Sequence, residues 1–236
     1  MERLNLKAKV LGENERIAAE LRQRFRESGV LVINLISSPG SGKTELLERT
    51  LAHLHNRTSP SGAALRVAVL TGDIQTDNDA RRLARYGFPA RQITTGGTCH
   101  LDGRMVTRGI EELGVDLRDL DVLFIENVGN LVCPASYDLG EEYKIVLLSV
   151  TEGEDKPLKY PAIFFKSNLF LLTKVDLLPY VPFDADVAER NARLVHPGME
   201  VVRCSATAAG GLDGWLEWLA GKMAAAREIA VASAGD

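Results

Sequence analysis

The sequence predicts an α/β protein built on a parallel β-sheet with helices on both faces. Short, nearly continuous apolar runs, typical of strands buried on both sides, alternate along the chain with longer segments in which apolar residues recur every three or four positions. Strands and helices that alternate in this way form parallel sheets, because each helix carries the chain back to the start of the next strand.

The expected elements follow one another from residue 11 to residue 226. The strands share a high content of apolar residues and are 30–36, 66–71, 90–93, 120–126, 144–151, 169–174 and 200–204. The helices share the helical apolar period and are 11–27, 43–55, 77–86, 101–113, 185–194 and 212–226. The polar segment 56–63 contains Pro and Gly and is expected to be a surface loop.

The composition is that of a globular protein, and it excludes several classes of function. Of the 236 residues 45% are hydrophobic and 25% are charged, and the formal net charge is −4. A negative net charge gives no global attraction to nucleic acid or to anionic lipid. No apolar run approaches the roughly 20 residues of a transmembrane helix, and the charged N-terminus argues against a signal peptide. Three cysteines are too few for a disulfide framework, so we expect a cytoplasmic protein with no nucleic-acid or membrane partner.

A phosphate-binding loop is predicted between the first long strand and the following helix. Residues 37–44 read SSPGSGKT, which matches a Walker A motif except that Ser37 replaces its first glycine. Lys43 would contact the β- and γ-phosphates, and the Thr44 hydroxyl would bind Mg²⁺. The backbone around the phosphates would come from Gly40, Ser41 and Gly42. This motif in this position predicts a parallel-sheet P-loop NTPase.

The base is predicted to be guanine. Lys174 and Asp176 lie in the sequence TKVD after a buried strand, and this sequence is similar to the guanine-recognition motif NKxD with Thr173 in place of Asn. An aspartate can accept hydrogen bonds from the N1–H and the 2-amino group of guanine, whereas adenine offers no such pair of donors. Ser205 and Ala206 follow the next strand and are expected to meet the guanine oxygen through the backbone.

Two acidic residues are placed to act near the phosphates. Asp73 and Glu126 each lie at the end of a predicted strand, and strand C-termini open onto the nucleotide in this class of sheet. We expect Lys43, Asp73 and Glu126 to be catalytic and Thr44 and Asp73 to bind Mg²⁺. The alternative is that either carboxylate only caps the next helix or turn.

A second metal site is suggested by Cys99, His100 and Cys133, which lie in loops rich in Gly and small residues. Thiolate and neutral imidazole are ligands for Zn²⁺ or Ni²⁺. Spacing alone leaves open that these are three unrelated side chains. Cys204 is expected in the core, and the remaining histidines, His53, His55 and His196, are expected to be exposed or to cap helices.

Five motifs together resemble the hydrogenase nickel-incorporation GTPases of the HypB family. The motifs are residues 37–44, 72–80, 98–102, 126–134 and 149–161. The resemblance implies a dimer that hydrolyses GTP with Mg²⁺ and helps to insert nickel into [NiFe]-hydrogenase. It implies that Cys99, His100 and Cys133 bind Ni²⁺ or Zn²⁺ at the subunit interface. It also implies a HypA-type nickel metallochaperone and the hydrogenase large subunit as partners.

The sequence departs from the family pattern at two places. Many family members carry an N-terminal Cys-rich or His-rich nickel site, whereas residues 1–29 contain neither Cys nor His, so we expect that site to be missing. The guanine motif begins with Thr173 instead of Asn. We divide the chain into an N-terminal helical segment, 1–29, and a P-loop GTPase domain with an embedded metal site, 30–230.

Three alternative functions fit the sequence less well. A urease-type nickel accessory GTPase would carry a Cys-Pro-His motif, but His100 directly follows Cys99 here. A P-loop kinase for small molecules would usually need an adenine site, which Lys174 and Asp176 disfavour. A metal storage protein would need more ligands than three cysteines and four histidines.

Overall fold

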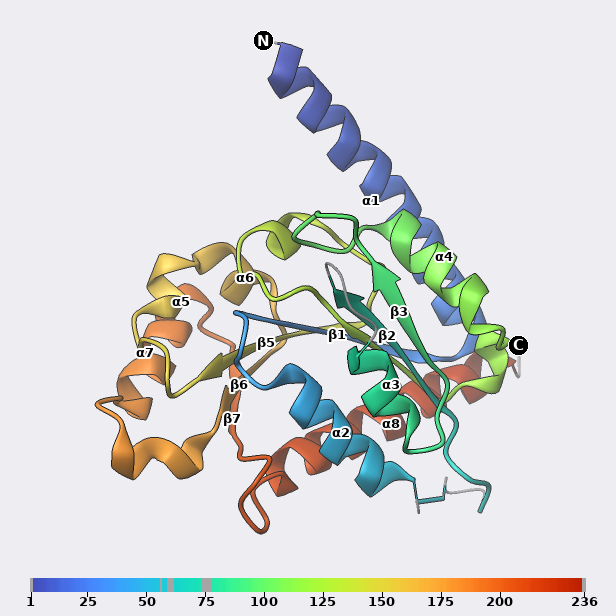
Figure 1. Ribbon diagram of the computed structural model, residues 1–236. Helices are drawn as coiled ribbons and strands as arrows, with labels where there is room; N and C mark the ends of the chain where they lie inside the picture. The colour runs from blue at the N-terminus through green and yellow to red at the C-terminus, as the bar shows by residue number, and fades with distance from the viewer. Residues whose placement is uncertain (1, 56, 59–61, 74–77, 235–236) are drawn as a thin grey trace.

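The computed structural model describes residues 2–55, 57–58, 62–73 and 78–234. Within this part of the chain, a seven-stranded sheet has the order β3-β2-β4-β1-β5-β6-β7, and every neighbouring pair is parallel. The strands are β1 (Leu31–Ser37), β2 (Val67–Asp73), β3 (Ala90–Thr94), β4 (Val122–Glu126), β5 (Tyr143–Ser149), β6 (Leu169–Thr173) and β7 (Glu200–Arg203) (Figure 1). The predicted fold class is therefore confirmed.

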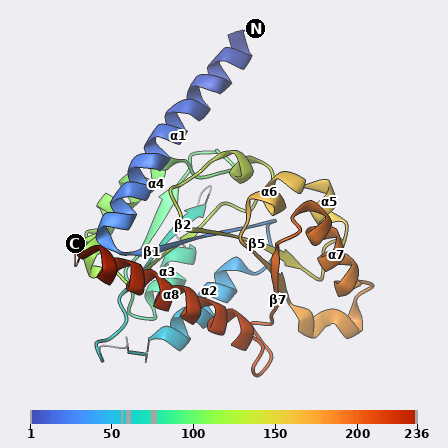
Figure 2. The same cartoon turned by 180° about the vertical axis from the view of Figure 1, so that it is seen from behind.

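Helices cover both faces of this sheet (Figures 1 and 2). The longer helices are α1 (Glu2–Ser28), α2 (Lys43–Leu54), α3 (Asn78–Ala84), α4 (Gly103–Leu113), α7 (Ala185–Val195) and α8 (Asp213–Ala234). The short helices are α5 (Lys156–Lys159) and α6 (Pro161–Lys166), and the 3₁₀ turns are η1 (Leu117–Asp119), η2 (Cys133–Ser136) and η3 (Val175–Tyr180). No helix in the described ranges is both long and apolar enough to cross a membrane.

Successive side chains of a strand point to opposite faces of the sheet, and a different set of helices packs on each face. In β1, Leu31, Ile33 and Leu35 pack with α2 and α8, whose buried members include Leu47 and Trp215. On the opposite face, α1 and α4 pack against β1, β2 and β4, while α6 and α7 pack against β5 and β6. The central strands are buried on both sides, which explains their nearly continuous apolar sequences.

The structure differs from the sequence prediction at short elements and in the length of the two terminal helices, α1 and α8. The short helices α5 and α6 and the 3₁₀ turns were not predicted, because they are too short to show an apolar period. Helix α1 begins at Glu2, well before the predicted residue 11. The first residue of the predicted helix 77–86 and half of the predicted loop 56–63 lie outside the described residues.

Candidate functional site

The phosphate-binding loop connects β1 to α2 at the carboxyl edge of the sheet. Gly40 and Gly42 have φ angles of 77° and 95°, which side chains with a Cβ rarely adopt. The buried Lys43 ammonium donates to the Ser37 hydroxyl over 2.7 Å. Ser37, the departure from the Walker A consensus, thus holds the lysine at the mouth of the loop. Because the loop opens at the start of α2, its amides and the helix dipole favour an anion there.

Neighbouring strands brace this loop through its carbonyl groups. The Thr173 hydroxyl donates to the Ser41 carbonyl over 2.7 Å, and the Lys174 ammonium donates to the Gly40 carbonyl over 2.7 Å. The Ser41 hydroxyl donates to the Glu152 carboxylate, also over 2.7 Å. Sequence reasoning did not single out Glu152. Its place in the family-like segment 149–161 was the feature that could have identified it.

Glu126 faces the predicted magnesium ligand. The Thr44 hydroxyl donates to the Glu126 carboxylate over 2.7 Å, and Glu126 is only 5% exposed. It ends β4, which lies between β1 and β2, with Thr71 of β2 as its registered partner. Asp73 ends β2 two residues beyond Thr71, on the same edge of the sheet. Both carboxylates therefore lie at the loop-bearing edge, while residues 74–77, after Asp73, are outside the described residues.

The predicted base-reading residues come together from two different strand ends. The Ser205 hydroxyl donates to one Asp176 oxygen over 2.5 Å, and the Thr207 hydroxyl donates to the other over 3.2 Å. The hydrogen bond from Ser205 is the main cause of a lowered pKa of Asp176. The carboxylate is thus held charged, as an acceptor for guanine must be. Lys174 adopts a left-handed φ of 59°, which turns the chain sharply between the loop contact and Asp176.

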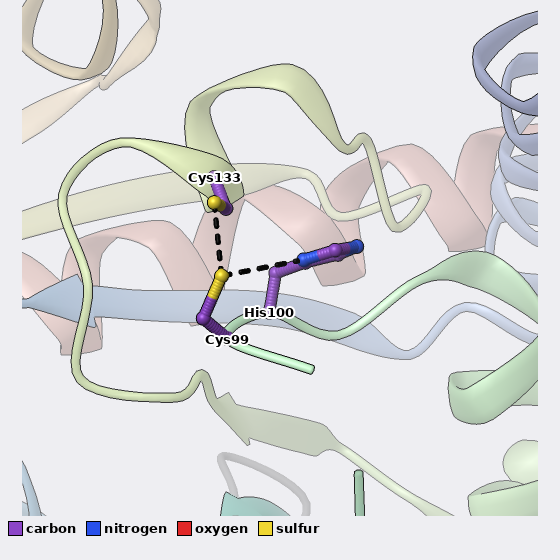
Figure 3. Close-up of side chains that lie close together, drawn as sticks. All are labelled: Cys99, His100 and Cys133. Atoms are coloured by element: carbon purple, nitrogen blue, oxygen red, sulfur yellow. Dashed lines mark hydrogen bonds between the residues drawn. The ribbon is translucent and has the colours of Figure 1, made fainter. Parts of the chain in front are cut away.

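Cys99, His100 and Cys133 converge from two loops (Figure 3). The Cys99 thiol donates to the Cys133 sulfur over 2.9 Å, and His100 Nδ1 lies 4.0 Å from the Cys99 sulfur. Ligand atoms of all three residues lie within 4.8 Å of one another, and the three side chains are half-buried. Two sulfur atoms and one imidazole nitrogen at this spacing suit a borderline cation such as Ni²⁺ or Zn²⁺.

Neighbouring side chains fix the two loops around this cluster. The Asn130 amide donates to the Cys99 carbonyl over 3.1 Å. The His100 ring stacks on Tyr137 with centroids 3.8 Å apart. Burial lowers the pKa of His100, which favours the neutral imidazole that a metal ligand must be. Neither Asn130 nor Tyr137 was identified from sequence.

Cys204, His55 and His196 lie where the sequence predicted, whereas His53 is half-buried instead of exposed or at a helix cap. Cys204 is 2% exposed in the core, and burial raises the pKa of its thiol to about 12. His55 and His196 occupy the C-cap positions of α2 and α7. His53 is in the last turn of α2, near the surface.

One residue connects the phosphate side to the metal side. Asn127 directly follows Glu126, is almost fully buried, and accepts a hydrogen bond from the Leu101 amide over 3.1 Å. Leu101 is the residue after His100. The end of β4 therefore contacts the phosphate loop through Glu126 and holds the Cys99–His100 loop through Asn127.

Comparison with known proteins identifies the family of this chain. The family model described as the CobW/HypB/UreG nucleotide-binding domain matches residues 31–203. Hydrogenase maturation factor HypB from Azotobacter vinelandii is 50% identical over 216 residues, covering 92% of this chain and 68% of the relative. The chain belongs to the HypB family.

Two solved HypB structures share the fold. HypB from Helicobacter pylori, crystallised in complex with nickel, is 38% identical and gives a TM-score of 0.81, with 89% of this chain and 95% of that chain covered. HypB from Archaeoglobus fulgidus is 36% identical with a TM-score of 0.80, and the match covers 90% of this chain and 99% of that chain. The seven-stranded sheet described above is therefore the HypB fold.

Proposed function

We propose that this chain is a GTP-hydrolysing metallochaperone that assists nickel insertion into [NiFe]-hydrogenase. The observation that carries the proposal is a cluster of two thiols and an imidazole tied, through consecutive residues Glu126 and Asn127, to a phosphate-binding loop. A nucleotide site alone would serve many functions. The family membership and the nickel complex of the Helicobacter pylori relative support nickel as the cargo.

The nucleotide part of the proposal is a hydrolytic site for GTP. Lys43 would stabilise the charge that develops on the transferred phosphoryl group, and Glu126 or Asp73 would orient the attacking water. Mg²⁺ held by Thr44 and Asp73 would neutralise the β- and γ-phosphates when bound. The oxygen donors fit that cation, since a hydroxyl and carboxylates are the ligands it prefers. Gly40, Ser41 and Gly42 would supply backbone contacts to phosphate.

The metal part of the proposal is a site completed by a second copy of the chain. Cys99, His100 and Cys133 offer three ligands, one fewer than Zn²⁺ usually takes and fewer than Ni²⁺ favours. Val132, next to Cys133, is 59% exposed, which leaves this edge of the cluster open to a partner. A symmetric homodimer would bring two such sets together. A HypA-type metallochaperone and the hydrogenase large subunit would give and receive the nickel.

Nucleotide state would control the metal site through the end of β4. Any shift of Glu126 when Thr44 turns toward Mg²⁺ and phosphate moves Asn127, which holds the loop of Cys99 and His100. Because linkage is reciprocal, nickel would also change the affinity for GTP. A nickel titration combined with GTP turnover on the same sample tests this: two independent sites would give a nickel Kd unaffected by GTP or GDP.

Replacing Asp176 with Asn is expected to weaken GTP binding and shift preference toward xanthine nucleotides. The amide cannot accept two hydrogen bonds from guanine as the carboxylate does, and the loss should be about 1.5–3 kcal/mol. The measurement is the Kd for GTP, XTP and ATP by calorimetry, with Asp186→Asn as a control on an exposed aspartate of α7. Equal affinity of the unmutated protein for ATP and GTP would refute the assignment.

The proposed role in hydrogenase maturation can be tested in the cell. Deleting the gene is expected to abolish [NiFe]-hydrogenase activity in medium low in nickel and to leave it recoverable by added nickel. Unchanged hydrogenase activity in the deletion strain, under both conditions, would contradict the proposed function.

A further inference from the structure

Helix α1, which precedes the matched family domain, contacts both loops that carry the Cys/His cluster. The contact centres on Asn14, which is 5% exposed although it lies on the first helix of the chain. Its amide nitrogen donates to the Asp138 carbonyl over 2.9 Å. Its amide oxygen accepts from the Gly103 amide over 2.8 Å. The Asn14 side-chain amide therefore hydrogen-bonds with both its nitrogen and its oxygen, and it joins two segments that are far apart in sequence.

Each of these two residues lies a short way after a proposed metal ligand: Gly103 three residues after His100, and Asp138 five residues after Cys133. Gly103 is also the first residue of α4. Its N–H is one of the groups that a helix start leaves without an intrahelical partner, so Asn14 caps α4 from another helix. Asp138 directly follows Tyr137, whose ring stacks on His100, and closes the segment that begins at Cys133. Besides their direct contacts around the sulfur atoms, the two segments are therefore also joined through Asn14.

Close packing leaves this contact little freedom. A Cβ on Gly103 would lie 2.7 Å from the Ile17 side chain, and a Cβ on Gly140 would lie 2.8 Å from the Ala18 carbonyl oxygen. The Arg22 guanidinium adds an ion pair to Asp138 at 2.6 Å. The two loops can approach α1 only because they present glycine there, and α1 in turn holds them at a fixed spacing.

We propose that Asn14 is a positioning residue for the metal site, which sets the spacing between the Cys99–His100 loop and the Cys133 loop. The proposal rests on the proposed function, because it takes Cys99, His100 and Cys133 as the nickel ligands. Groups behind metal ligands fix ligand orientation, and removing them weakens metal binding without removing a ligand. The same contact makes α1 responsive to the metal, since coupling between two sites acts in both directions.

Asn14→Leu keeps the side-chain volume but removes both hydrogen bonds, and it is expected to raise the Kd for Ni²⁺ by about tenfold. Asn14→Asp keeps an acceptor for Gly103 N–H and loses the donor to Asp138, so its Kd should lie between those of Asn14→Leu and the unmutated protein. The probe is Ni²⁺ added to the metal-free full chain, followed by the nickel–thiolate absorption bands. The matched control is Asn191→Leu, which removes one hydrogen bond from an α7 asparagine to the Glu154 carbonyl and should leave the Kd unchanged.

Hydrogen exchange gives a second result, and its first part is measured on the unmutated protein, so it does not depend on a variant folding well. Ni²⁺ is expected to slow amide exchange in residues 10–22 of α1 in the unmutated protein, and this protection should be lost in Asn14→Leu. An unaltered Kd in both Asn14 variants, an equal loss in Asn191→Leu, or no nickel-dependent protection of α1 would each overturn the inference. If Cys99→Ala also kept full nickel binding, the proposed metal site itself would be wrong. If Cys99→Ala lost it while the Asn14 variants did not, only the role of Asn14 would fail.

Discussion

Replacing either Cys99 or Cys133 with alanine is expected to abolish Ni²⁺ and Zn²⁺ binding in the micromolar range. Each substitution removes one sulfur from a pair only 2.9 Å apart, so each copy of the chain keeps a single thiolate beside His100, and a site shared by two copies loses two of its thiolate ligands. The affected step is metal binding alone, because both thiols lie outside the phosphate loop. Metal-free GTP turnover should therefore remain close to that of the unmutated protein.

Cys204→Ala is the matched control for this experiment. Its thiol is buried in the core and its pKa is raised to about 12, so it offers no thiolate to a metal. The titration is followed by sedimentation, because a metal shared between two copies should drive dimer formation at the same concentrations. Loss of nickel in Cys204→Ala together with retention in Cys99→Ala would show that the ligands have been misassigned.

Lys43→Ala is expected to abolish GTP turnover and to weaken binding of the triphosphate more than that of the diphosphate. The buried ammonium is already held at the loop by Ser37, so its charge is preorganised where negative charge develops. Its removal leaves the transferred phosphoryl group without a counter-charge. The measurements are phosphate release under single-turnover conditions and separate binding constants for GDP and a non-hydrolysable GTP analogue.

A suitable control for Lys43→Ala is Lys166→Ala. Lys166 donates to the Ala135 carbonyl over 2.9 Å and lies on α6, away from the loop. Turnover in this control should be unchanged. Near-normal hydrolysis by Lys43→Ala would mean that the loop does not perform the phosphate chemistry proposed for it.

Much of the fold could be predicted because the apolar pattern of the sequence matches the burial of the strands and of the longer helices. The seven strands were all predicted to within two residues at each end, and the five inner strands carry the apolar sequences of strands buried on both faces. Helices α5 and α6 escaped prediction, because a helix of one or two turns shows no period and is held by packing against α7 and β5. The first residues of α1 were missed for a similar reason, as they lack the apolar spacing that marks residues 17, 21 and 25.

Candidate site residues that belong to sequence motifs could be predicted, whereas those that matter through tertiary contacts could not. Lys43, Thr44, Asp176 and the Cys/His residues belong to recognisable motifs. Glu152, Tyr137 and Asn14 act through partners more than a hundred residues away or in other loops, and no spacing rule brings them together. Ser37 was recognisable as a departure from the Walker A motif, but its contact with Lys43 depends on how the loop folds and could not be predicted from spacing.

The bracing of the phosphate loop by Thr173 and Lys174 has a consequence for how the whole nucleotide is held. The strand end that anchors the carbonyls of Ser41 and Gly40 is also the one that leads into Asp176. The phosphates and the base of a bound GTP would therefore contact two parts of one element, the end of β6 and the residues that follow it. Each half of the nucleotide would then favour the binding of the other. Triphosphate and guanosine as separate fragments would together recover far less binding free energy than the intact nucleotide.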